Sequence, residues 1–71
     1  MKESEFLQKI SKKIVELRES KDLSQAELAE KLGWHRTAIS RIESGKTESS
    51  ITKYWKVAEA LGVSLSKLIE S

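Results

Sequence analysis

The sequence has no cysteine, no proline and a single histidine among its 71 residues. Without cysteine, neither a disulfide framework nor a thiolate metal site is available. With His35 as the one histidine, no structural zinc site and no cofactor are expected. No apolar run approaches the ~18 residues that would suggest a membrane span. The N-terminal residues M-K-E-S-E-F do not resemble a signal peptide. These absences predict one small cytoplasmic domain, residues 1–71, with a thin core.

The sequence also lacks the residue sets that common enzymes need. No Ser-His-Asp set, no pair of carboxylates in a pocket and no glycine-rich phosphate loop can be assembled from it. The chain is therefore not expected to be an enzyme.

Net charge is small, but its distribution is uneven. The formal charge of +2 is too low to indicate a nucleic-acid partner by itself. Residues 1–33 are neutral overall, and residues 57–71 carry a net charge of −1. Residues 34–56 hold five basic and two acidic residues, so the positive excess lies in this segment.

The most informative stretch runs from Ser24 to Gly45 and predicts two short helices joined by a tight turn. Leu28, Ala29 and Leu32 share one face of the first helix, and Ile39 and Ile42 share one face of the second. Between them Gly33 allows a positive φ at little steric cost. Ala29 is small, so the second helix can cross closely there.

The outward face of the second helix carries hydrogen-bond donors that suit base edges and phosphates. These donors are Arg36, Thr37, Ser40 and Arg41. A helix-turn-helix whose second helix exposes such donors is typical of proteins that bind duplex DNA in the major groove.

By these residues the chain resembles the lambda-repressor/Cro (XRE-like) helix-turn-helix superfamily. The resemblance is strong because of the joint spacing of its matching positions, which are Ser24-Gln25, Leu28-Ala29, Leu32-Gly33, Ile39 to Glu43, Gly45-Lys46 and Ala58 to Leu65. Among the branches of that superfamily, such short proteins look most like controller proteins of restriction–modification systems and small repressors of phages or mobile elements.

The resemblance implies a role for particular side chains. Bases would be contacted by Arg36, Thr37 and Arg41, with His35 and Ser40 as helpers. Phosphates would be contacted by Gln25, Ser44, Lys46 and Thr47. Gln25 would also brace the recognition helix. Arg18 would form an ion pair with Glu43 and so join the first helix to the recognition helix.

Several of these assignments have a plainer alternative. Arg18 would otherwise be an exposed arginine without a fixed partner, and Gln25 an ordinary surface residue. His35 replaces the usual capping residue and either contacts DNA or is exposed. Trp34 is expected to cover the turn, partly buried. Asp22 stands where the superfamily usually has glycine, in a left-handed conformation that costs aspartate some strain.

The remaining segments predict an all-α fold of five short helices around one core. The first helix should run from about Ser4, as N-cap, to Ser20. Ser24 and Glu27 should form a capping box. Ser50 should cap a fourth helix that buries Ile51, Trp55, Ala58 and Leu61, with Tyr54 and Val57 beside them. Ser64 should cap the last helix.

The expected working species is a homodimer on a palindromic DNA operator. One short recognition helix contacts only a few base pairs, whereas two copies can place their helices about 34 Å apart. The expected dimer interface consists of Val63, Leu65, Leu68 and Ile69, of which at least one or two should stay exposed in the monomer. The alternative is that these side chains only close the core.

The partners expected are thus double-stranded DNA and a second copy, with a contact to RNA polymerase left open, as is the choice between activator and repressor. A second hypothesis for function is an antitoxin that binds a toxin and its own operator.

Overall fold

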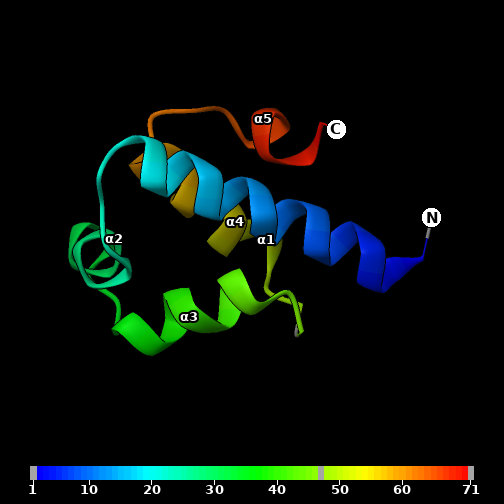
Figure 1. Cartoon of the computed structure of the whole chain (residues 1–71), viewed down its shortest axis with the longest axis horizontal. Helices are drawn as coiled ribbons and strands as arrows, with labels where there is room; N and C mark the ends of the chain where they lie inside the picture. Colours follow the sequence, from blue (N-terminus) through cyan, green and yellow to red (C-terminus); the bar gives the residue numbers. More distant parts are fainter. Residues whose placement is uncertain (1, 47, 71) are drawn as a thin grey trace.

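The computed structural model describes residues 2–46 and 48–70. Within them the chain forms five α-helices and no strand: α1 (Glu3–Ser20), α2 (Gln25–Leu32), α3 (Arg36–Ser44), α4 (Ile51–Ala60) and α5 (Leu65–Ile69). In Figure 1, α1 crosses the molecule between α3 and α5, with α4 behind it. The chain turns from the C-terminal end of α1 into α2, which packs on α3. The predicted all-α fold of five helices is confirmed.

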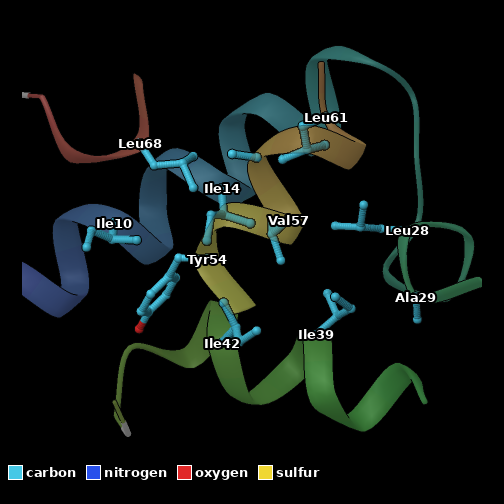
Figure 2. Close-up of a cluster of buried hydrophobic side chains, with 11 residues drawn as sticks. Ile10, Ile14, Leu28, Ala29, Ile39, Ile42, Tyr54, Val57, Leu61 and Leu68 are labelled. Atoms are coloured by element: carbon cyan, nitrogen blue, oxygen red, sulfur yellow. The ribbon is translucent and has the colours of Figure 1, made fainter. Parts of the chain in front are cut away.

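One cluster of buried side chains joins the helices (Figure 2). Its members are Ile10, Ile14, Leu28, Ala29, Ile39, Ile42, Tyr54, Val57, Ala58, Leu61 and Leu68. The predicted faces of α2 and α3 are confirmed, because Leu28, Ala29, Ile39 and Ile42 are all at most 2% exposed. No described helix combines the length and the apolar composition that a bilayer crossing requires.

The start of α1 differs from the prediction. The helix begins at Glu3 with Lys2 in the N-cap position, so Ser4 lies inside the first turn and is not the cap. Lys2 makes no side-chain capping bond. Glu3 and Glu5 place negative charge at the positive end of the helix dipole instead, which favours the longer helix.

The connection from α1 to α2 is formed as predicted. Asp22 has a φ of 56°, in the left-handed region where glycine would be at ease. Ser24 accepts a hydrogen bond from the Glu27 backbone N–H at 3.0 Å, and the Glu27 carboxylate accepts one from the Ser24 N–H at 2.8 Å. This capping box fixes the N-terminus of α2.

The buried face of α4 was predicted only in part. Ala58 and Leu61 are buried, but Ile51 is 62% exposed and Trp55 is 48% exposed. Ile51 is the first residue of the helix, where its side chain points back toward the N-terminus and away from the core. Tyr54 is buried in place of Trp55, and its hydroxyl accepts a hydrogen bond from the Ser49 N–H at 3.3 Å.

The predicted serine caps of the last two helices behave differently. Ser50 accepts a hydrogen bond from the Lys53 N–H at 3.3 Å, as expected of an N-cap. Ser64 occupies the N-cap position of α5 but makes no capping bond. Its hydroxyl lies 2.9 Å from that of Ser66 instead.

Candidate nucleic-acid interface

A sharp turn sets the angle between α2 and α3. Gly33 ends α2 with a φ of 71°, and a Cβ there would meet nothing within 4 Å, so the position needs glycine for its backbone angle alone. The next residue, Trp34, donates its backbone N–H to the Ala29 carbonyl at 2.9 Å and packs half-buried against the core. The prediction that Trp34 is partly buried is confirmed.

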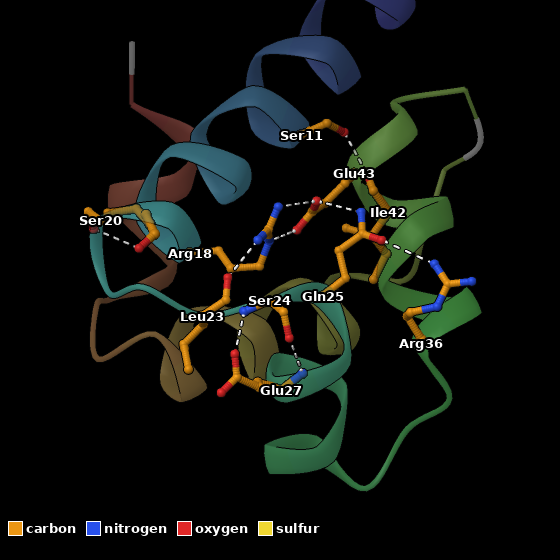
Figure 3. Close-up of polar contacts among 11 residues, drawn as sticks. Ser11, Arg18, Ser20, Leu23, Ser24, Gln25, Glu27, Arg36, Ile42 and Glu43 are labelled. Atoms are coloured by element: carbon orange, nitrogen blue, oxygen red, sulfur yellow. Dashed lines mark hydrogen bonds and ion pairs between the residues drawn. The ribbon is translucent and has the colours of Figure 1, made fainter.

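An ion pair links α1 to α3 (Figure 3). Arg18 Nε lies 2.7 Å from Glu43 Oε2, and Arg18 Nη2 lies 3.1 Å from Glu43 Oε1, so the guanidinium binds both carboxylate oxygens. The two side chains are 12% and 5% exposed. Hydrogen bonding to Glu43 raises the pKa of Arg18 above its ordinary value. Arg18 also donates to the Leu23 carbonyl at 2.6 Å, which ties the α1–α2 connection to the same pair.

Gln25 extends this ion pair to the first residue of α3. Its Nε2 donates to Glu43 Oε1 at 2.9 Å, and its Oε1 accepts a long hydrogen bond from Arg36 Nη1 at 3.4 Å (Figure 3). We call the chain of contacts formed by Arg18, Glu43, Gln25 and Arg36 the polar relay. It connects three helices and ends on a residue that is expected to contact bases. The resemblance predicts that Gln25 holds a phosphate and braces the recognition helix, and its bonds to Glu43 and Arg36 form such a brace, although Arg36 was not predicted as its partner.

The C-terminal end of α3 approaches α1 closely. Ser11, which is 4% exposed, donates its hydroxyl to the Ile42 carbonyl at 2.6 Å. Gly45 follows with a φ of 68°, and a Cβ there would lie 3.3 Å from both Gln8 Cα and Ser11 Oγ. Gly45 is therefore required for its backbone angle and for space.

The side of α3 that faces away from the core carries most of the predicted base contacts. Thr37 and Arg41 are exposed, and Ser40 is half-buried. His35 is exposed in the N-cap position and makes no side-chain capping bond. Arg36 leans toward Gln25 on α2, while Arg41 lies on the opposite flank of the helix, toward α4. The two arginines thus border the exposed face of α3 on either side.

A shallow hollow next to Arg41 adds a residue that sequence analysis did not assign to the site. Lys53, in the first turn of α4, lines this hollow together with His35, Thr37 and Arg41. The only sequence signal was its place in the positively charged segment 34–56. The fold brings it beside the recognition helix, so α4 contributes a cation to the same surface.

The predicted phosphate contacts after α3 are only partly available. Lys46 is exposed. Ser44 is exposed, but its hydroxyl proton goes to the Arg41 carbonyl at 2.7 Å, and its oxygen accepts from the Lys46 N–H at 3.3 Å. Ser44 therefore stabilises the helix end and has no hydroxyl proton left for a phosphate in this arrangement. Thr47 lies outside the described residues.

The residues predicted for the dimer interface do not share one environment. Leu68 is 2% exposed and belongs to the core, so it is not among those of the four side chains that stay exposed in the monomer. Val63 and Leu65 are half-buried against the core. Ile69 is 42% exposed. Leu68 points inward because α5 closes the core over α1 and α4.

Residues 14–68 match the family model described as helix-turn-helix (HTH_3). The chain belongs to this family. The matched range contains α2, α3 and α4 in full, together with the turn at Gly33 and both ends of the polar relay.

Individual relatives cover most of the chain. The control protein C.MunI of a Mycoplasma species is 40% identical over 57 residues, which make up 79% of this chain and 77% of that protein. The restriction-modification controller protein C.AhdI of Aeromonas hydrophila superposes with a TM-score of 0.86 at 31% identity, over 96% of this chain and 99% of that one. An HTH_3 family transcriptional regulator of Vibrio cholerae has a TM-score of 0.86 at 28% identity. The alignment covers 94% of this chain but 38% of that regulator, so this chain spans well under half of its length.

Proposed function

We propose that this protein regulates transcription by binding duplex DNA at specific sequences, with α3 in the major groove. The observation that carries the proposal is the exposed face of α3, which presents Thr37 between Arg36 and Arg41 on a helix fixed to α1 and α2 by the polar relay. An arginine can donate two hydrogen bonds to guanine O6 and N7, the commonest specific contact in the major groove.

Each side chain of this surface has a proposed role. Arg36, Thr37 and Arg41 contact bases, with Ser40 and His35 at the edges. Lys46 and Lys53 neutralise phosphates on the flank where α3 meets α4, because both are exposed cations beside the recognition helix. Gln25 keeps its proposed phosphate contact, since an amide nitrogen has a second N–H besides the one that Glu43 accepts. Thr47 contacts a phosphate as well, and Ser44 does so once its hydroxyl turns from the Arg41 carbonyl toward the DNA.

The relatives suggest the regulated system. C.MunI and C.AhdI are named as control or controller proteins, and this chain covers most of each. We extend that role to this chain and propose a controller of a restriction–modification system that acts as a homodimer on a palindromic operator. Two recognition helices about 34 Å apart would enter successive major grooves. No observation favours the antitoxin alternative.

Selection of bound sequences from a random DNA pool tests the proposal. We expect a two-fold symmetric site to be enriched. A pool without any enriched sequence would contradict the proposal. Transcription from the selected site with purified RNA polymerase, with and without the protein, then shows whether binding represses or activates.

Two variants divide base contacts from phosphate contacts. Arg41→Ala should weaken operator binding by roughly 1–3 kcal/mol and relax the preference at one base position per half-site. Lys46→Ala should weaken binding to all DNA sequences alike. It should also lower the steepness with which log K, the logarithm of the DNA association constant, falls with log salt by about one. If Arg41→Ala weakened all sequences equally, Arg41 would be a phosphate contact.

A further inference from the structure

The exposed large apolar side chains of the described residues come from α1, α4 and α5, and none of them belongs to α3. They are Phe6, Ile51, Trp55 and Ile69, which are 39%, 62%, 48% and 42% exposed. Phe6, Ile51 and Ile69 come from α1, α4 and α5 and line the same groove. Trp55 follows Ile51 by one helical turn, so the two residues share one face of α4.

The groove has an apolar floor and room for a large side chain. It encloses about 300 Å³, and its floor is formed by the buried side chains of Leu7, Ile10, Tyr54 and Leu68. Glu3 and Glu48 stand at its edge. An apolar patch with a polar rim is typical of a surface that another molecule covers.

We propose that a second copy of the chain covers this groove, with Trp55 of each copy seated in the groove of the other. The inference rests on the proposed function, which requires two copies, and it names the surface that joins them. A two-fold interface must be complementary to itself, and here an exposed indole follows, by one turn of α4, a residue that lines an apolar groove. Because Trp55 is 48% exposed in the monomer, seating it in the partner removes up to about half of the 150–250 Å² that an aromatic side chain can bury.

The location of the groove agrees with this arrangement. None of the residues that line it belongs to α3, so a second copy seated there leaves the proposed base contacts Arg36, Thr37 and Arg41 uncovered. Leu65 and Ile69 of the interface predicted from sequence line the groove. The interface then shifts from α5 alone to α1, α4 and α5 together, and it gains Trp55, which the sequence had placed in the core.

Fluorescence of Trp55 tests whether that side chain becomes buried on association. Trp55 is the only tryptophan of a Trp34→Phe variant, so its emission reports on one site. We expect the emission to shift to shorter wavelength as protein concentration rises, in step with the doubling of mass in sedimentation equilibrium. A doubling of mass without an emission shift would overturn the inference, as would a protein that stays monomeric at every concentration.

Mixing two variants tests whether the indole enters the groove of the partner. Trp55→Ala removes the indole, and Ile69→Glu places a charge in the groove. Both positions are exposed, so the monomer should keep its fold, which a thermal melt of each variant verifies. Each variant should self-associate at least tenfold more weakly than the unaltered chain, whereas Ala26→Glu, an exposed position on α2, should not.

An equal mixture of Trp55→Ala and Ile69→Glu contains one intact indole and one intact groove per mixed dimer. The mixture should therefore associate more tightly than either variant alone. If it associates no better than the more tightly associating of the two variants, the two tryptophans meet each other or another surface is used, and the inference is wrong.

DNA binding by the same samples separates this inference from the proposed function. A protein that dimerises through Trp55 but binds no DNA would contradict the proposed function and support the proposed interface. A protein that binds its operator as a dimer, with Trp55→Ala dimerising normally, would contradict the interface and leave the function standing.

Discussion

The two sides of α1 contact the rest of the molecule through different kinds of interaction. On the edge that faces α2 and α3, Arg18 and Ser11 make directional bonds to Glu43 and to the Ile42 carbonyl. We call this edge the polar side. On the edge that faces α4 and α5, Phe6 and its neighbours border an apolar groove. We call that edge the apolar side.

This difference matches what each side has to do. Hydrogen bonds and bidentate ion pairs fix angles as well as distances, so the polar side sets the orientation of the recognition helix. Apolar contact is non-directional and depends on the area removed from water. The apolar side can therefore accept a partner without disturbing α3. Substitutions on the two sides should differ in size accordingly.

The largest effect is expected from Glu43→Ala, which removes the acceptor at the centre of the polar relay. Breaking a buried ion pair costs about 3–5 kcal/mol. Because Arg18 keeps some solvent exposure and its bond to the Leu23 carbonyl, we expect about 3 kcal/mol of lost stability in chemical denaturation. Glu30→Ala, at an exposed position of α2, is the control and should change stability by less than about 0.5 kcal/mol.

A double-mutant cycle completes this experiment. If the stability losses caused by Arg18→Ala and Glu43→Ala simply add in the double variant, the two side chains do not stabilise each other, and the ion pair does not orient α3.

A pair of glycine substitutions measures how closely α1 and α3 approach on the polar side. Gly33→Ala and Gly45→Ala both place alanine at a left-handed φ, which costs about 1–2 kcal/mol. At Gly45 the new methyl group also meets the Gln8 backbone at 3.3 Å. We expect about 1 kcal/mol for Gly33→Ala and about 2–3 kcal/mol for Gly45→Ala in thermal or chemical unfolding. If the two variants lost the same stability, α1 would be able to move away from the new methyl group at little cost.

On the apolar side, Tyr54→Phe should have a smaller effect. It removes the acceptor of the Ser49 N–H but keeps the ring in the core, so we expect a loss of about 1 kcal/mol in chemical denaturation. A loss as large as that of Glu43→Ala would show that the apolar side also depends on a directional bond.

The smallest effect concerns the capping box and depends on pH. Hydrogen bonds from Ser24 lower the pKa of Glu27 below its ordinary value of 4.5. The ionised carboxylate therefore contributes stability above that value, and the contribution is lost as pH falls through the lower pKa of the folded state. Glu27→Gln should be less stable than the unaltered chain at neutral pH, and the difference should vanish in acid. A difference that is independent of pH would contradict this explanation.

Local rules and a family pattern were enough to predict much of the polar side. The cap at Ser24 follows from side-chain chemistry at a helix start, and the Arg18–Glu43 contact follows from the resemblance. The bonds from Ser11 to α3 and from Arg36 to Gln25 were missed, because a serine or a surface arginine has many candidate partners. The distance in space that selects one of them exists only in the fold.

The apolar side was predicted less well because α4 has apolar residues around too much of its circumference. Ile51, Tyr54, Trp55, Val57, Ala58 and Ala60 all lie within its ten residues. Periodicity then permits two overlapping faces, one centred on Trp55 and one on Tyr54. Packing against α2 and α5 selects the second face, and this choice leaves Ile51 and Trp55 on the surface.

Glu48 and Ser49 stand between the two surfaces proposed here as interfaces. They line the apolar groove, and they also line a second hollow together with Arg41 and Lys53. A molecule seated in the groove therefore touches the same two residues that border the cations beside the recognition helix. If pairing of two copies shifts these residues so that the affinity for DNA rises, DNA must raise the affinity between copies by the same factor. Under that linkage, promoter occupancy would rise more steeply than in proportion to protein concentration, so that a gradual accumulation of the protein in a cell becomes an abrupt change in gene expression.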